Sequence, residues 1–385
     1  MASKIPSYAK EDRRFGETVD IPFLILVLLL LIVGLTMLYS ASCAQSQFDT
    51  GYEISTKYLQ KQAVCALMGL GAMAVFSRIP AQLWHRTAWW LYGLSIVLLL
   101  SVLVIGEEVN GARRWINLAG IQFQPSEVAK FSMIVLFARL TRSFGPEAKK
   151  FRFGVLGFGC ALLGILIPLA LEKHLSAIML MGMVAVVMMF VAGTSPRWLL
   201  AGAGAAALFV VIYISFMGYA GDRVTAWLHP EADPGDTGYQ ILQSLYAIGS
   251  GGLFGLGFGK SRQKYLYLPF QYNDYNFAMI CEELGLAGAV LIIALFAMII
   301  LRGYWIALRA GDRFSTVLAA GLTTLIAVQT ILNLCVVTNL LPSTGIALPF
   351  FSYGGTALAV TLGEMGIILS ISRQRNQIKK QEVIL

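Results

Sequence analysis

Residues 265–301, YLYLPFQYNDYNFAMICEELGLAGAVLIIALFAMIIL, join a polar, aromatic segment to a long apolar run that begins at Phe277. The apolar part is longer than the ~20 residues that an α-helix needs to cross ~30 Å of hydrocarbon. Asp274 stands where the two parts meet, and a carboxylate at a membrane edge is costly to retain without a use. The stretch therefore predicts a membrane-spanning helix with a functional carboxylate at its outer edge.

Similar apolar stretches recur along the whole chain, of which 57% is hydrophobic and only 13% charged. Ordinary soluble domains are roughly one-quarter charged. The predicted spans are 21–43, 58–77, 87–105, 126–141, 153–171, 175–193, 197–216, 277–301, 315–337 and 355–371. We therefore expect an all-α integral membrane protein of about ten transmembrane helices, folded as a single polytopic domain over residues 1–385.

The distribution of Lys and Arg predicts the orientation in the membrane. With ten spans both termini share one side, and 19 of the 29 Lys and Arg residues fall on that side. The positive-inside rule makes it cytoplasmic, together with the tails 1–20 and 372–385. Anionic lipids of the inner leaflet account for the net charge of +8, so no nucleic-acid partner is needed to explain it.

Three polar loops, at 44–57, 106–125 and 217–276, are predicted to face outward and to be irregular. The last is far longer than an ordinary connection, which indicates a function of its own. Within it, 239–249 has the spacing of a short interfacial helix, and the glycines of 249–259 suggest a flexible loop. No phosphate-binding glycine loop follows a strand, which argues against nucleotide use.

The first outward segment with charged residues is GARRWINLAGIQFQPSEVAK, residues 111–130. Pro125 and Ser126 are typical of a helix start, and Glu127 and Lys130 are spaced to share one helix face. One interpretation is a local ion pair with arginines that snorkel to the membrane surface. The other makes Arg113, Arg114 and Lys130 ligands of a pyrophosphate, which suits the guanidinium fork.

The second segment, 238–285, adds three cations and two more glutamates. Lys260, Arg262 and Lys264 are further candidate ligands of a phosphorylated, lipid-linked substrate. At about 100° per helical residue, Glu282 is expected about 80° from Asp274 and Glu283 about 180° away. Glu282 is thus the expected second carboxylate of the site, and Glu283 is expected to pair with a cation elsewhere in the bundle.

The third segment is LPSTGIALPFFSYGGTALAVTLGEMG, at 341–366. Its two prolines, Gly345 and the pair Gly354-Gly355 interrupt an apolar run. Interrupted helices occur at membrane depth where the backbone lines a water-filled cavity. Hydroxyl side chains cluster here, among them Ser352, which we take as a candidate substrate ligand. The alternative is an ordinary turn before the last span.

At these segments the chain resembles the SEDS family of bacterial membrane proteins, those of shape, elongation, division and sporulation. The resemblance is carried by GARRWI with FQPSEVAK, by GYQILQSLYAIGSGGLFGLG, by YLPFQYNDYNFAMICEELG and by GIALPFFSYGGTA, and it covers nearly the whole chain. The arrangement QSLYAIGSGGLFGLGFGKSRQKYLYLP is more similar to the division and spore-cortex branch than to the rod-elongation branch.

The resemblance implies a peptidoglycan glycosyltransferase that polymerises lipid II at the outer face of the cytoplasmic membrane. It implies a class B penicillin-binding protein as partner, alongside other division or sporulation proteins. It assigns Asp274 the catalytic role and places Arg114, Glu127 and Lys130 in an extracellular cavity. No cofactor is implied with certainty, although a divalent cation could share the charge of the leaving group.

The chain departs from the family pattern at several positions. Phe270 and Asn273 replace a common Glu and Thr near Asp274. Glu172-Lys173-His174 stands where many members have Glu-Pro-Asp, which leaves Glu172 as the nearest substitute for a carboxylate that pairs with Lys130.

Two other functions fit the composition. The same cavity and cations could bind the headgroup of lipid II in a transporter that flips it across the membrane. A non-catalytic scaffold, whose outward loops dock a transpeptidase, is the other. An isolated base at the outer surface fits the transporter less well than the enzyme.

Overall fold

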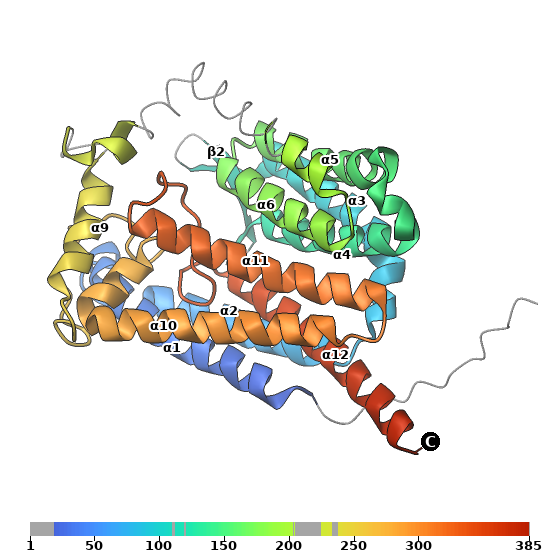
Figure 1. Cartoon of the computed structure of the whole chain (residues 1–385). Helices are drawn as coiled ribbons and strands as arrows, with labels where there is room; N and C mark the ends of the chain where they lie inside the picture. The colour runs from blue at the N-terminus through green and yellow to red at the C-terminus, as the bar shows by residue number, and fades with distance from the viewer. Residues whose placement is uncertain are drawn as a thin grey trace, which may run out of the picture.

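The structure, a computed structural model, describes residues 19–109, 112–118, 121–202, 204, 225–232 and 238–384. Long helices form a bundle in which α10 and α11 lie side by side (Figure 1). The helices are α1 (Ile21–Asp49), α2 (Lys57–Phe76), α3 (Ala81–Ile105), α4 (Pro125–Phe144), α5 (Phe158–Leu171), α6 (Leu175–Val191), α9 (Tyr239–Ser250), α10 (Asn276–Leu308), α11 (Arg313–Val337) and α12 (Thr356–Ile384). A 3₁₀ turn (Gly145–Lys149) and a π-helical turn (Arg152–Gly157) connect α4 to α5.

Seven helical segments among the described residues are long and apolar enough to cross a membrane. They are α1, α2, α3, Arg152–Leu171, α10, α11 and the Thr356–Gln374 part of α12. Helix α6 is equally apolar but shorter. The predicted span 197–216 lies largely outside the described residues, as do the tail 1–18 and most of the first part of the loop 217–276, so the count of ten stays a prediction.

Helix α4 coincides with the fourth predicted span, although it carries four charged residues. Every residue from Ala129 to Ala138 is buried. The helix packs against α3, α5, α6 and α11, so it contacts protein where an outer helix would contact lipid. Charged side chains are tolerated in such a helix because they face the bundle interior and pair there.

The loop at 106–125 is not irregular, and the prediction was wrong on this point. It folds into a small antiparallel sheet of β1 (Glu107–Val109), β2 (Ala112–Leu118) and β3 (Ile121–Phe123), in the order β1-β2-β3. The all-α description therefore needs this addition. The alternation of exposed Arg113 and Asn117 with buried Ala112 and Ile116 is the period of two that a strand requires.

Helix α10 is interrupted at Gly285, where φ is 66° and ψ is −168°. The glycine-rich loop before it hydrogen-bonds to both sides of this break. The amide of Leu256 donates to the carbonyl of Glu282 at 2.9 Å, and the amide of Leu286 donates to the carbonyl of Gly252 at 2.9 Å. The expectation of a flexible loop is wrong, because these bonds tie it to the helix.

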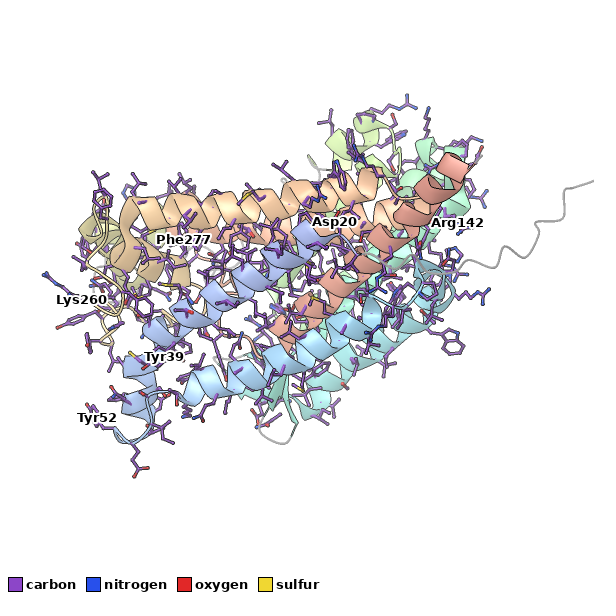
Figure 2. The ribbon with its side chains drawn as sticks, turned by 90° about the horizontal axis from the view of Figure 1, so that it is seen from below. Asp20, Tyr39, Tyr52, Arg142, Lys260 and Phe277 are labelled. Atoms are coloured by element: carbon purple, nitrogen blue, oxygen red, sulfur yellow. The ribbon has the colours of Figure 1, made fainter. Side chains whose placement is uncertain are left out.

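An ion pair joins helices at the opposite end of the bundle. Arg302 of α10 donates to both carboxylate oxygens of Asp20 at 2.9 Å, and Asp20 also accepts from the amide of Phe23 at the start of α1. Figure 2 shows Asp20 and Arg142 toward one end of the molecule and Lys260 and Tyr52 at the other. The ion pair and the glycine-rich loop therefore lie toward opposite ends of the molecule, with the loop at the end marked by Lys260.

Candidate active site

A cavity of about 880 Å³ gathers residues from segments that are far apart in the sequence. Its lining residues come from the start of α2, strands β2 and β3, the start of α4, the turn between α5 and α6, the turn before α10 and the segment before α12. Among the predicted site residues, the structure brings Arg114, Glu127, Lys130 and Asp274 together in this lining. The three sequence segments singled out for their charges and turns therefore meet in one place.

The backbone of Asp274 is held by a side chain of α11. The side-chain amide of Asn333, on α11, donates to the carbonyl of Asp274 at 2.7 Å. A Cβ atom on Gly345 would lie 3.7 Å from Asp274 Oδ2, so the segment before α12 passes directly beside the carboxylate. Helix α10 begins only at Asn276, so the expected angle between Asp274 and Glu282 around one helix does not apply.

Glu127 and Lys130 form an ion pair of 2.7 Å in the first turns of α4. Their side chains are 13% and 6% exposed, which confirms the prediction that they share one helix face. Ser126 is buried beside them, and its hydroxyl has no hydrogen-bond partner within the described part of the chain. This wall of the cavity therefore offers a charge-balanced pair and an unused hydroxyl.

The adjacent arginines of β2 have different surroundings. Arg114 lines the cavity and donates from Nη2 to the carbonyl of Lys173 at 2.5 Å. Arg113 is 48% exposed, lies 3.6 Å from Glu108 and donates to the carbonyl of Leu103. Of these two arginines, both predicted as pyrophosphate ligands, only Arg114 lines the cavity.

The turn between α5 and α6 holds two buried titratable groups, Glu172 and His174. Burial raises the pKa of Glu172 to about 8, against the opposing effect of the Arg114 charge. Burial, together with the charges of Arg114 and Lys130, lowers the pKa of His174 to about 3. His174 lines the cavity, whereas Lys130 pairs with Glu127 and takes no ion pair from Glu172 in the described structure.

The remaining charged candidates do not line the cavity. Lys264 is buried and lies 3.7 Å from Glu283, which confirms that Glu283 pairs with a cation. Glu282 accepts hydrogen bonds from the hydroxyl of Ser261 and from the amide of Arg262, so it anchors the loop. The side chains of Lys260 and Arg262 are exposed, and Figure 2 shows Lys260 at the outer edge of the molecule.

Ser352 also has a local contact. Its hydroxyl accepts from the amide of Leu348 at 2.7 Å and closes the turn before α12. The amide of Gln62, on α2, donates to the Ser352 carbonyl and accepts from the amide of Gly355. These bonds hold the segment in place. Ser352 does not line the cavity, so the predicted contact of its side chain with a substrate is not supported.

Sequence reasoning missed several lining residues at the start of α2, beside Asp274 and in the turn between α5 and α6. They are Lys57, Tyr58, Lys61, Tyr272 and His174. The signal for the lysines was present, because they stand at the outer edge of a span on the side that has few cations. The tyrosines gave no such signal, since aromatic residues are common at membrane edges for other reasons.

A bundle of apolar helices that encloses a charged cavity near one end defines a multi-pass membrane protein with a candidate active site at that end. The chain belongs to the FtsW, RodA and SpoVE family of cell cycle proteins, whose family model matches residues 21–377.

Relatives cover almost the whole chain. A probable peptidoglycan glycosyltransferase FtsW of Geobacter sulfurreducens is 40% identical over 361 residues, which cover 92% of this chain and 95% of that protein. Stage V sporulation protein E of Bacillus subtilis is 38% identical over 360 residues, covering 92% of this chain and 97% of that protein. The peptidoglycan glycosyltransferase MrdB of Escherichia coli is 35% identical over 368 residues, covering 94% and 95%. The similarity to the division and spore-cortex branch is confirmed.

A solved structure supports the same fold. It is described as the structural coordination of polymerization and crosslinking by a peptidoglycan synthase complex, and it matches with a TM-score of 0.79. The sequence identity is 28%, and the match covers 94% of this chain and 99% of that chain.

Proposed function

We propose that this chain is a peptidoglycan glycosyltransferase that polymerises lipid II into glycan strands at the outer face of the cytoplasmic membrane during division or sporulation. The observation that carries the proposal is the cavity in which Asp274 shares a lining with Arg114 and Lys130. A carboxylate and two cations are the groups that a transfer from a pyrophosphate-linked sugar requires. The names of the relatives agree with this activity.

Asp274 is the proposed general base. The 4-hydroxyl of a GlcNAc unit attacks the anomeric carbon of a MurNAc unit, and the bond from that carbon to undecaprenyl pyrophosphate breaks. Asp274 accepts the hydroxyl proton, a role that contributes typically ~10²–10⁴-fold to the rate. Its place in a turn fixed by Asn333 keeps the carboxylate at the cavity without depending on a helix face.

Arg114 and Lys130 are the proposed partners of the leaving group. The pyrophosphate gains negative charge as its bond to the sugar breaks, so fixed cations stabilise the transition state more than the ground state. Glu127 holds Lys130 in place and balances its charge before substrate arrives. A divalent cation could add to this charge, although the described residues include no group of three His, Cys, Asp or Glu side chains suited to bind one.

The finer topology belongs to the same proposal. The chain is expected to form one polytopic domain over 1–385 with ten spans and cytoplasmic termini, and the cavity and the loop 217–276 face outward. Arg142, Arg302 and Arg313 lie at helix ends on the side proposed as cytoplasmic, in agreement with the positive-inside rule.

A class B penicillin-binding protein is the proposed partner, which would cross-link the strands that this chain makes. The similarity to a chain of a peptidoglycan synthase complex supports this assignment.

The test is glycan formation from purified lipid II in liposomes, with and without the candidate class B partner. Wild type should form polymer, and Asp274→Asn should form none while it inserts and folds normally. Glu147→Gln, at an exposed carboxylate far from the cavity lining, is the matched control and should keep the wild-type rate. Polymer from Asp274→Asn at the wild-type rate would refute the base assignment. Translocation of lipid II without polymer from wild type would identify a flippase.

A further inference from the structure

Three tyrosines from three separate segments meet in the lining of the cavity. Tyr58 comes from the start of α2, Tyr272 from the turn before α10 and Tyr353 from the segment before α12. The ring centroids of Tyr58 and Tyr272 are 4.5 Å apart, and those of Tyr58 and Tyr353 are 5.0 Å apart. The third pair, Tyr272 and Tyr353, is separated by 6.0 Å. We call this set the tyrosine platform.

Contacts with the protein fix the platform. The hydroxyl of Tyr272 donates to that of Tyr58 at 3.4 Å, and the Tyr58 hydroxyl donates to Asp49. The amide of Tyr353 donates to the carbonyl of Tyr272 at 2.8 Å. Burial raises the pKa of Tyr272 and of Tyr353, so both are neutral phenols near pH 7. Two of the hydroxyls are therefore engaged in a chain of hydrogen bonds, and the half-buried rings line the cavity.

Tyr272 packs in part against the apolar core of the bundle, but all three rings also line the cavity. Tyrosines of an aromatic belt, by contrast, lie at the membrane–water interface. The platform instead shares a polar cavity with Asp274, Lys61 and Gln122. Half-buried aromatic rings beside charged and amide side chains indicate a ligand that has both an apolar face and a polar rim.

We propose that the tyrosine platform binds the acceptor sugar of the polymerisation reaction and holds its hydroxyl beside Asp274, an inference that rests on the proposed function. A GlcNAc ring in its chair form carries its substituents equatorially, so its faces present C–H bonds that pack on aromatic rings. Its hydroxyls lie at the rim. Only Asn273 separates Tyr272 from Asp274, so the platform and the base keep a fixed relation.

The cavity then has two functional sides. The platform and Asp274 serve the acceptor sugar, whereas Arg114 and Lys130 serve the pyrophosphate of the donor. This arrangement predicts selectivity, because a sugar with an axial 4-hydroxyl would present a polar group on the face that packs against the rings.

The test measures binding of lipid II in vesicles to the full chain in the Asp274→Asn background, which is proposed to bind without turnover. Tyr272→Leu, which keeps an apolar side chain but removes the ring, should weaken binding about tenfold, as expected for the loss of one aromatic contact. Tyr272→Phe keeps the ring and should weaken it about twofold. Tyr246→Leu, at an exposed tyrosine of α9 outside the lining, is the matched control.

Thermal unfolding of each variant separates a binding defect from a folding defect. If Tyr272→Leu unfolds, Tyr353→Leu replaces it with the same expectation. Equal affinities of the Leu and Phe variants for lipid II would overturn the proposal that the tyrosine platform binds the acceptor sugar. That result would leave polymerisation by wild type intact. Absence of polymer from wild type would instead refute the proposed function.

Discussion

The side-chain amide of Asn333 donates to the carbonyls of Asp274 and Ile346, each at a distance of 2.7 Å. Asn333 is fully buried in α11, so one side chain fixes the turn that carries the proposed base to the segment that precedes α12. The position of Asp274 therefore depends on a residue that does not itself line the cavity.

Asn333→Ala should lower the rate of polymerisation while leaving the binding of lipid II nearly unchanged. The buried carbonyl of Ile346 loses its donor, at about 1–3 kcal/mol, and the half-buried carbonyl of Asp274 loses the bond that fixes its turn. We expect a decrease of about 10²-fold in kcat, the order that a misplacement of about 1 Å can cause. The measurement is the initial rate of glycan formation. Thr330→Val, one helical turn away at a hydroxyl with no hydrogen-bond partner in the described structure, is the control.

Glu283→Gln should harm folding more than turnover. Glu283 accepts from the Ser40 hydroxyl at 2.6 Å and lies 3.7 Å from Lys264, and both charged side chains are buried. The change leaves a buried ammonium without its counter-charge, which costs about 3–5 kcal/mol. Thermal unfolding in detergent should show a clear loss for Glu283→Gln and almost none for Glu147→Gln. Equal melting temperatures for the two variants would contradict the assignment.

The two arginines of β2 should respond differently to removal. Arg114→Ala should lower the polymerisation rate by about 10²–10³-fold, the order seen when one stabilising donor is removed from a transition state. Arg113→Ala removes an exposed ion pair, worth about 0–1 kcal/mol, and a hydrogen bond to the Leu103 carbonyl, and it should keep most of the activity. Similar losses from both changes would contradict the different roles assigned to the two arginines.

Glu172 should make stability depend on pH. Its pKa rises from 4.5 in the unfolded chain to about 8 in the folded one, so the folded state binds the extra proton between these values. The stabilisation from that proton is fully present below about pH 4.5 and is lost as the pH rises toward 8. Glu172→Gln, which imitates the protonated form, should therefore gain stability relative to wild type as the pH rises over this range. Melting temperatures of the two proteins across that range provide the measurement.

Apolar length alone was sufficient to predict most of the helices, because a bilayer sets a minimum length that few other structures share. The pairing of Glu127 with Lys130 was also predictable, since it follows from helical spacing within one element. Both features depend on local sequence.

The interruption of α10 and the role of Glu282 could not be predicted in the same way. The angle expected between Asp274 and Glu282 assumed one continuous helix, whereas Asp274 lies in a turn before Asn276. The tyrosine platform depends on contacts between residues more than 200 positions apart in sequence, as for Tyr58 and Tyr272. Spacing within one segment carries no information about such contacts.

The break at Gly285 also has a mechanical consequence. Gly251 and Gly255 lie so close to the carbonyls of Cys281 and Glu283 that neither position has room for a Cβ atom. The loop cannot slide over the helix, and lifting it would leave backbone carbonyls unpaired. A displacement of this loop must therefore move the start of α10 with it, and the hydrogen bonds from the Ser40 hydroxyl to Glu283 extend this connection to α1.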